Sequence, residues 1–309
     1  MQFVVLRNPS SSKNRAGKTK PYPSHIHPID LTDIASLPDI LAGLHKDGVK
    51  CIIVDGGDGT VREVLTHLPN IYGADLPFIG ILPHGNTNLI ARNTGALDSP
   101  TSLLKIEDLP AQEDAAFLRK VPMLRLDFEG SQQPPLRGFM MGWGAFARAT
   151  QFAIEESTST GPFQVLNVFF KTLKLDFLQG RKGVMRQGIP ADLTIDGEPA
   201  EQGHRFIGLV TTLKGTLVAG LNPFWGKGEG AIRWTDVLAP APHLVPAAFI
   251  AITGRCMKWM LRRGYHSGHA EKLDLIIDTP LVLDGELIPI DQKQKISITA
   301  QEKVYFISI

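Results

Sequence analysis

The sequence predicts an α/β domain built on a parallel sheet, followed by a β-rich second domain. In the first third of the chain, short apolar runs alternate with segments of helical spacing, a pattern typical of a parallel sheet covered by helices. After about residue 120, short apolar runs follow one another, and many are separated by turns rich in glycine and proline. The length of 309 residues is sufficient for two ordinary domains.

The first domain is expected to contain three buried strands and three helices. Each strand is a short apolar run that stops at polar residues, glycine or proline, and the runs are 3–6, 49–54 and 78–82. The first helix ends at Gly48. It contains four apolar residues at helical spacing: Leu37, Ile40, Leu41 and Leu44. A second helix is predicted from Thr60 to Leu68, and a third begins within residues 88–93.

The second domain is expected to consist mainly of short strands. The predicted strands are 121–128, 138–142, 191–195, 206–211, 231–237, 273–277, 281–283 and 295–299. We therefore expect an α/β domain at 1–125 and a β-rich domain at 126–294, with a C-terminal tail of about 295–309 that can return to the first domain.

Composition narrows the class of protein. The chain is 43% hydrophobic and 20% charged, which is typical of a folded globular protein. A formal net charge of +1 gives no global field for nucleic acid, so no nucleic-acid partner is expected. Two cysteines predict a reducing compartment rather than a disulfide framework. We see no signal peptide, and the longest nearly apolar stretch, 244–252, is too short to span a bilayer, so a cytoplasmic location is expected.

The most informative segment is a glycine-rich turn between a predicted strand and a predicted helix. It begins at Asp55 and contains Gly56, Gly57, Asp58, Gly59 and Thr60. Glycines allow close approach of the backbone to a ligand, and a helix N-terminus favours phosphate. The threonine is expected to cap the helix or to bind a phosphate oxygen. The aspartate indicates a metal or a proton beside that phosphate. A plain strand-to-helix turn is the alternative interpretation.

A second polar turn occupies the equivalent place after the third predicted strand. It contains His84, Gly85, Asn86, Thr87 and Asn88. The carboxyl ends of neighbouring parallel strands meet at one edge of a sheet, where open α/β sheets bind their ligands. We therefore expect the two turns to lie together. A third segment, 12–19, nearly matches the P-loop pattern, but Ser12 replaces its first glycine and prolines follow where a helix is needed.

These turns resemble the catalytic domain of the diacylglycerol kinase family, which includes ceramide, sphingosine and bacterial lipid kinases. The family's motifs have counterparts here in the same order: Asn8-Pro9, Gly56 to Thr60, Glu63, Gly85 to Asn88, Ala91-Arg92, Asp127 and Asp284-Gly285-Glu286. NAD kinases share the first glycine turn. The Ala-Arg pair and the late Asp-Gly-Glu favour the lipid kinases.

The resemblance implies an ATP-dependent lipid kinase that uses Mg²⁺. The residues implied for the nucleotide are Asn8, Pro9, Gly56, Gly57, Asp58, Gly59, Thr60, Glu63, His84, Gly85, Asn86, Thr87 and Asn88. Asp58 and Asp127 would position Mg²⁺ or its waters. Glu286, with Asp284 beside it, would deprotonate the acceptor hydroxyl, with Asp58 as the rival base. In isolation, Asp-Gly-Glu is more often a hairpin turn. The acceptor is diacylglycerol, ceramide or a sphingoid base.

Three departures from the family pattern leave alternatives open. Ser12 replaces a usual glycine, Arg62 stands where asparagine is common, and Leu89 replaces a carboxylate. A kinase for a soluble acceptor such as NAD and a sensor of lipid or nucleotide that has lost catalysis are the competing interpretations. The acids at Asp58, Asp127 and Glu286 argue against the sensor.

Two stretches combine apolar, aromatic and basic residues, as proteins that bind the bilayer interface do. They are 163–178 and 249–263, and the second includes Arg262 and Arg263. They predict peripheral association with an anionic membrane surface at the inner face of the membrane, and a buried core is the alternative. A sheet edge in the second domain is also expected to be able to pair in a homodimer. Four histidines without a completed ligand set are interpreted as surface residues rather than a zinc site: His25, His27, His266 and His269.

Overall fold

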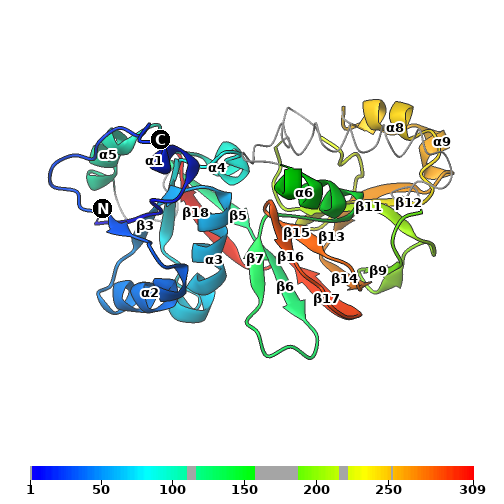
Figure 1. Ribbon diagram of the computed structural model, residues 1–309, viewed down its shortest axis with the longest axis horizontal. Coiled ribbons are helices and arrows are strands. Elements are labelled where there is room, and N and C mark those ends of the chain that lie inside the picture. The colour runs from blue at the N-terminus through cyan, green and yellow to red at the C-terminus, as the bar shows by residue number, and fades with distance from the viewer. Residues whose placement is uncertain (1, 110–115, 157–186, 216–221, 252) are drawn as a thin grey trace. The chain divides into compact units, whose positions relative to one another are not determined.

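A computed structural model describes residues 2–109, 116–156, 187–215, 222–251 and 253–309 (Figure 1). The chain forms two compact units. Unit 1 contains residues 1–122 and 303–309, and unit 2 contains residues 123–302. Unit 2 is therefore inserted between two segments of unit 1, and the last residues of the chain belong with the first.

Unit 1 is built on a six-stranded sheet whose N-terminal strands are parallel, as the alternating pattern predicts. Its strands, in spatial order, are β2 (Ile29–Asp30), β1 (Val4–Arg7), β3 (Cys51–Gly56), β4 (Phe78–Pro83), β18 (Lys303–Ile307) and β5 (Leu118–Pro122). The C-terminal strand β18 runs parallel to β4 and antiparallel to β5. The chain therefore adds the inner strand β18 to the sheet only after it has passed through unit 2.

Helices cover the sheet of unit 1. They are α1 (Ser12–Arg15), α2 (Leu37–Lys46), α3 (Asp58–Tyr72), α4 (Leu89–Thr94) and α5 (Leu103–Glu107). Successive residues of β3 point to opposite faces, and all of them are buried. Cys51 and Ile53 pack in one cluster with Leu103 and Ile106 of α5. A strand that is buried on both faces explains the continuous apolar run in the sequence.

Unit 2 consists of two antiparallel six-stranded sheets. One contains β10 (Glu198–Pro199), β9 (Ala191–Ile195), β14 (Lys272–Ile277), β17 (Gln294–Thr299), β6 (Leu124–Phe128) and β7 (Leu136–Gly138). The other contains β13 (Tyr265–Ala270), β12 (Ile232–Leu238), β11 (Arg205–Thr211), β8 (Met140–Gly144), β15 (Leu281–Leu283) and β16 (Glu286–Ile288). The predicted β-rich second domain is confirmed.

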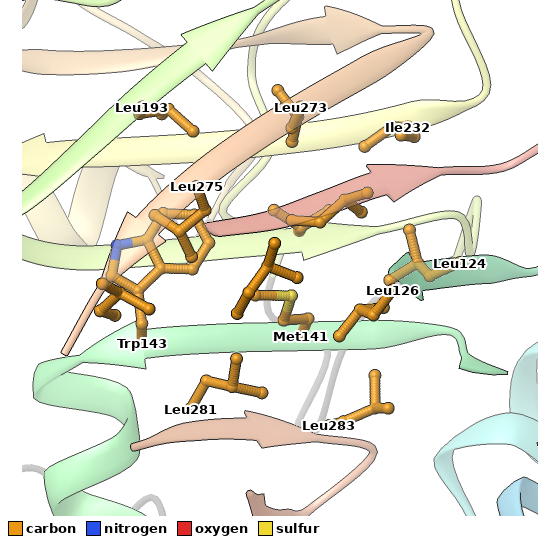
Figure 2. Close-up of a cluster of buried hydrophobic side chains, with 14 of the residues drawn as sticks. Leu124, Leu126, Met141, Trp143, Leu193, Ile232, Leu273, Leu275, Leu281 and Leu283 are labelled. Atoms are coloured by element: carbon orange, nitrogen blue, oxygen red, sulfur yellow. The ribbon is translucent and has the colours of Figure 1, made fainter. Parts of the chain in front are cut away.

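The core of unit 2 is formed by apolar side chains from both sheets, which share one buried cluster (Figure 2). Leu126 and Leu275 come from one sheet, and Met141, Trp143 and Leu283 come from the other. Because apolar and polar residues alternate along these strands, every second side chain points toward the opposite sheet. Unit 2 is therefore a β-sandwich.

Three helices of unit 2 have no counterpart in the strands predicted from the sequence. They are α6 (Ala145–Glu156), α8 (Leu244–Ala251) and α9 (Lys258–Leu261). Ala247 of α8 and Met260 of α9 are buried in a second apolar cluster, together with Phe206, Val237 and Tyr265 from the strands. Among the described residues, no helix is both long enough and apolar enough to cross a membrane. The predicted interfacial stretch 163–178 lies outside the described residues.

Two predicted elements differ from the structure by more than small shifts of their ends. The single strand expected at 121–128 is divided at Met123 into β5 of unit 1 and β6 of unit 2, because its two halves pair with different partners. The helix after the glycine turn begins at Asp58 rather than Thr60 and runs through Pro69 to Tyr72. The turn is therefore shorter than the sequence suggested.

Candidate active site

Three turns meet at one edge of the sheet in unit 1. In the parallel register, Arg7 pairs with Asp55 and Gly56 pairs with Pro83, so β1, β3 and β4 end level with one another. The segment starting at Asn8 and the two polar turns predicted from the sequence follow those ends directly. The expectation that the two polar turns lie together is confirmed.

The two glycine turns touch through their backbones. A Cβ atom placed on Gly85 would lie 2.4 Å from the Cα atom of Gly57, and one placed on Gly57 would lie 3.0 Å from the Cα atom of Gly85. Real Cβ atoms do not approach other carbon atoms this closely. Glycine is therefore required at Gly85 by the contact itself, and the turn edge presents backbone rather than side chains.

The first turn is tied to the end of β1. The side-chain amide of Asn8 donates to Thr60 Oγ1 at 2.8 Å, and the backbone N–H of Asn8 donates to the carbonyl of Asp55 at 2.8 Å. The predicted capping role of Thr60 is wrong, since Gly57 is the N-cap of α3 and Thr60 lies inside the helix. Pro9 follows Asn8 at this edge and is half-buried.

Asp55 is a buried acid that the sequence analysis did not single out. Its carboxylate accepts a hydrogen bond of 2.7 Å from Asn14 Nδ2 and lies 2.6 Å from His84 Nδ1. The hydroxyl of Tyr22 also donates to it, and burial together with this bond raises the pKa of Tyr22. The side chain is 1% exposed, so it acts below the turns rather than on a ligand. The sequence signal that could have identified Asp55 is an acidic residue at the end of an otherwise apolar strand.

The second turn is held by its own asparagine. Asn88 adopts a left-handed conformation with φ of 50°. Its Oδ1 accepts from the N–H of Gly85 at 3.0 Å, and its Nδ2 donates to the carbonyl of Gly85 at 2.9 Å. Asn86 is exposed and Thr87 is half-buried at the tip of this turn. The side chain of His84 is turned inward to Asp55, so its predicted contact with a nucleotide stays a prediction.

Asp58 links the two glycine turns. Its carboxylate accepts the backbone N–H groups of Leu89 and Ile90 at 2.9 and 3.0 Å, at the start of α4. Burial raises the pKa of Asp58, although these two amides and the charge of Arg92 act in the opposite direction. The side chain of Leu89, which replaces a carboxylate of the family pattern, is buried.

Glu63 lies one turn further along α3 and is held by its neighbours. The guanidinium of Arg62, which is 5% exposed, bonds to it, and His67 Nε2 lies 4.0 Å from its other oxygen. The arginine at the position where asparagine is common thus partners the family's glutamate. The predicted role of Glu63 toward the nucleotide stays a prediction.

In unit 2, the Asp-Gly-Glu motif forms a hairpin between β15 and β16. Asp284 and Gly285 both have positive φ, 48° and 89°, and Leu283 pairs with Glu286 across the turn. The carboxylate of Asp284 is buried and accepts the N–H groups of Phe139 and Met140 at 2.8–3.1 Å. Asp284 therefore supports the backbone between β7 and β8. Glu286 is exposed at the start of β16.

Asp127 belongs to a charged cluster in unit 2. Both of its oxygens accept from Arg125, through Nε and Nη2 at 2.8 Å each. Arg125 holds the pKa of Asp127 below its usual range. Glu302 joins the cluster, because it accepts from Arg125 at 3.0 Å and from the buried Arg137. Burial alone would raise the pKa of Glu302, but the two arginines lower it.

No metal site is assembled from these acids within either unit. In the part of the chain that the structure describes, no three histidine, cysteine, aspartate or glutamate side chains are grouped so as to hold a metal ion. Asp58 is engaged by two amides and Asp127 by a guanidinium, and they belong to different units. A carboxylate keeps further lone pairs beyond these hydrogen bonds, so the predicted role of Asp58 and Asp127 toward Mg²⁺ stays a prediction. Two of the histidines that the sequence analysis interpreted as surface residues each face a single glutamate. Nε2 of His25 lies 2.9 Å from a carboxylate oxygen of Glu107, and Nε2 of His266 lies 2.8 Å from one of Glu201.

Comparison with known proteins gives matches to one family. Residues 2–113 match the family model of the diacylglycerol kinase catalytic domain. A lipid kinase of Escherichia coli K12, YegS, and the probable lipid kinase YegS of Shigella flexneri are each 43% identical over 61 residues. That segment covers about a fifth of this chain and a fifth of each relative.

The fold of the whole chain also has solved counterparts. Two crystal structures of Bacillus anthracis str. Sterne proteins assigned as diacylglycerol kinases cover 100% of this chain and are themselves covered to 97%. Their TM-scores are 0.66 and 0.60 at 14% identity, which establishes a shared fold. The predicted resemblance is therefore confirmed, and in sequence it rests on residues 2–113, which match the family model of the diacylglycerol kinase catalytic domain.

Proposed function

We propose that this protein transfers the γ-phosphoryl group of ATP, taken up as its magnesium complex, to a hydroxyl group of a membrane lipid. The observation that carries the proposal is the backbone contact between Gly57 and Gly85. It brings the backbones of the two turns together at the N-terminus of α3, where amide N–H groups and the helix dipole favour phosphate. The matched relatives are lipid kinases, which supports a kinase rather than another phosphate-binding protein.

The nucleotide is assigned to the three turns of unit 1. Asn8 and Thr60 are already hydrogen-bonded to each other and fix the first turn, and Asn88 fixes the second. Asn86 and Thr87 at the turn tip provide polar groups near the same edge. Catalysis of phosphoryl transfer rests mostly on positioning and charge stabilisation, which a rigid turn pair supplies.

Glu286 is the better candidate for the general base than Asp284. The carboxylate of Asp284 is buried on two backbone amides, whereas the side chain of Glu286 is exposed. In the proposed step, the lipid oxygen forms a bond to the γ-phosphorus, the bond to the bridging oxygen breaks, and ADP leaves. The hydroxyl proton passes to the carboxylate.

The test is transfer of labelled γ-phosphate to diacylglycerol, ceramide, sphingoid bases and NAD, with lipids in mixed micelles. A labelled lipid supports the proposal and identifies the acceptor. Labelled NADP would instead place the chain with the soluble-acceptor kinases, and ATP binding without any product would favour a sensor. Glu286→Gln is expected to abolish transfer while ATP affinity is retained, and Glu271→Gln, an exposed glutamate of the same unit, serves as the matched control. Full turnover by Glu286→Gln would exclude this role.

A further inference from the structure

The helices α8 and α9 leave an apolar surface exposed in unit 2. Val245 and Phe249, one helical turn apart on α8, are 49% and 72% exposed. Met257, just before α9, and Leu261 at its end are 51% and 50% exposed. Scattered single apolar residues are ordinary on protein surfaces, but these four large ones lie on or next to two helices that share one buried cluster.

The patch points away from the core of unit 2. Both helices bury their other face in the same apolar cluster, through Ala247 of α8 and Met260 of α9. Trp259 packs edge-on against the ring of Tyr265, which fixes α9 on the strand β13. Figure 1 shows α8 (yellow) and α9 (orange) next to each other at one end of the unit. The helices are therefore anchored on one side and expose apolar side chains on the other.

The charge around the patch has one sign. Four basic residues belong to the same segment, in or next to α9, and all are exposed: Arg255, Lys258, Arg262 and Arg263. No aspartate or glutamate occurs between Asp236 and Glu271. The whole chain has a formal net charge of +1, so without these four basic residues the rest of the chain has a net charge of −3. The positive charge is thus concentrated where the exposed apolar side chains are.

We infer that the α8–α9 surface, defined as Val245, Phe249, Met257 and Leu261 with the four basic residues in or next to α9, docks on an anionic lipid bilayer. Apolar side chains enter the boundary between headgroups and acyl chains, while arginine and lysine contact anionic headgroups. A second protein copy is a poorer occupant, because two such surfaces would bring eight like charges together. The docking surface is independent of the phosphoryl-transfer step and requires no nucleotide.

The experiment is co-sedimentation of the full chain with vesicles of phosphatidylglycerol and phosphatidylcholine, and with vesicles of phosphatidylcholine alone, without ATP. We expect binding to the anionic vesicles that weakens with salt. The double variant Arg262→Gln/Arg263→Gln should bind about 25-fold more weakly, at roughly fivefold per charge. Phe249→Ser should lower binding by at least about tenfold, because a large apolar side chain no longer enters the lipid.

Matched control variants distinguish the effect of this surface on vesicle binding from the effect of losing any exposed charge or any exposed apolar side chain. Lys46→Gln/Lys50→Gln removes two exposed charges elsewhere, and Leu104→Ser removes an exposed leucine of α5. Both should bind vesicles like the unchanged chain. Equal binding by the surface and control variants, or no binding to anionic vesicles, would overturn the inference. So would a dimer in solution that Phe249→Ser dissociates, because the patch would then be an interface between copies.

Kinase activity provides a separate readout. In detergent micelles, which present lipid without a bilayer, Arg262→Gln/Arg263→Gln should transfer phosphate at the rate of the unchanged chain. On anionic vesicles its rate should fall together with binding. Loss of activity in both assays would show that these arginines act on transfer rather than on docking. Vesicle binding without any kinase activity would leave the docking surface intact and remove the proposed function.

Discussion

The contact between the two glycine turns makes Gly85→Ala the most informative substitution in unit 1. The added Cβ atom would lie 2.4 Å from Gly57 Cα and 3.0 Å from Asn88 Oδ1. Carbon atoms in contact are normally about 3.5–4.0 Å apart, so the turns must separate by roughly 1 Å. Gly85 does not have a positive φ, so alanine suits its backbone and the contact alone sets the effect.

The expected cost follows from overpacking. Inserting a methyl group into a well-packed contact destabilises by about 1–3 kcal/mol, which lowers the melting temperature of a domain of this size by roughly 3–9 °C. A misplacement of about 1 Å at a reacting centre reduces turnover by roughly 100-fold. Thermal unfolding and labelled phosphate transfer measure these two effects, and ATP affinity is expected to fall because the turns separate.

The matched control is Gly43→Ala. Gly43 lies inside α2, and a Cβ atom there would meet nothing within 4 Å. Alanine should stabilise the helix by about 0.5–1 kcal/mol and leave ATP affinity unchanged. If Gly85→Ala retains the melting temperature and ATP affinity of the unchanged chain, the argument that the glycine contact builds the nucleotide edge is refuted.

Two further predictions concern unit 2. Asp284→Ala should destabilise unit 2 by about 1–3 kcal/mol in denaturant unfolding, because it leaves the N–H groups of Phe139 and Met140 without their acceptor, and stability equal to that of the unchanged chain would contradict it. The pKa of Glu302 is lowered below 4.5, so its stabilising effect is present above that pH and is lost as the pH falls through the lower folded value. Glu302→Gln should therefore flatten the decline of unfolding free energy on the acid side, and an unchanged pH profile would contradict the pairing with Arg137 and Arg125.

The sequence was most predictive where a local pattern determines the structure. The buried strand β3 is a continuous apolar run, and α2 has leucines at helical spacing, so both were identified within a few residues. The glycine turns were found because glycines and small polar residues between an apolar run and a helical pattern are a local signal. Helix α8 was missed because it is apolar on all sides and follows a series of strands, so it has no periodic signal.

The sequence did not predict which residues far apart in the chain contact one another. The residues 121–128 look like one strand, and only their different partners, β18 and β17, divide them. Asp55 looks like the first residue of a turn, and its contacts with Asn14, Tyr22 and His84 depend on the folded chain. The hairpin of Asp284 was among the interpretations considered, but its carboxylate bonds to Phe139 and Met140 were not foreseeable.

The insertion of unit 2 within unit 1 has a consequence for the order of folding. Strands β5 and β18 pair across residues 123–302, a loop of about 180 residues. Folded unit 2 brings the ends of that loop together, since the N–H of Met123 donates to the carbonyl of Glu302 at 2.8 Å. Shortening the effective loop from about 180 residues to a few removes roughly 3 kcal/mol of closure entropy. We therefore expect unit 2 to fold first and the sheet of unit 1 to close afterwards, as a slower kinetic phase.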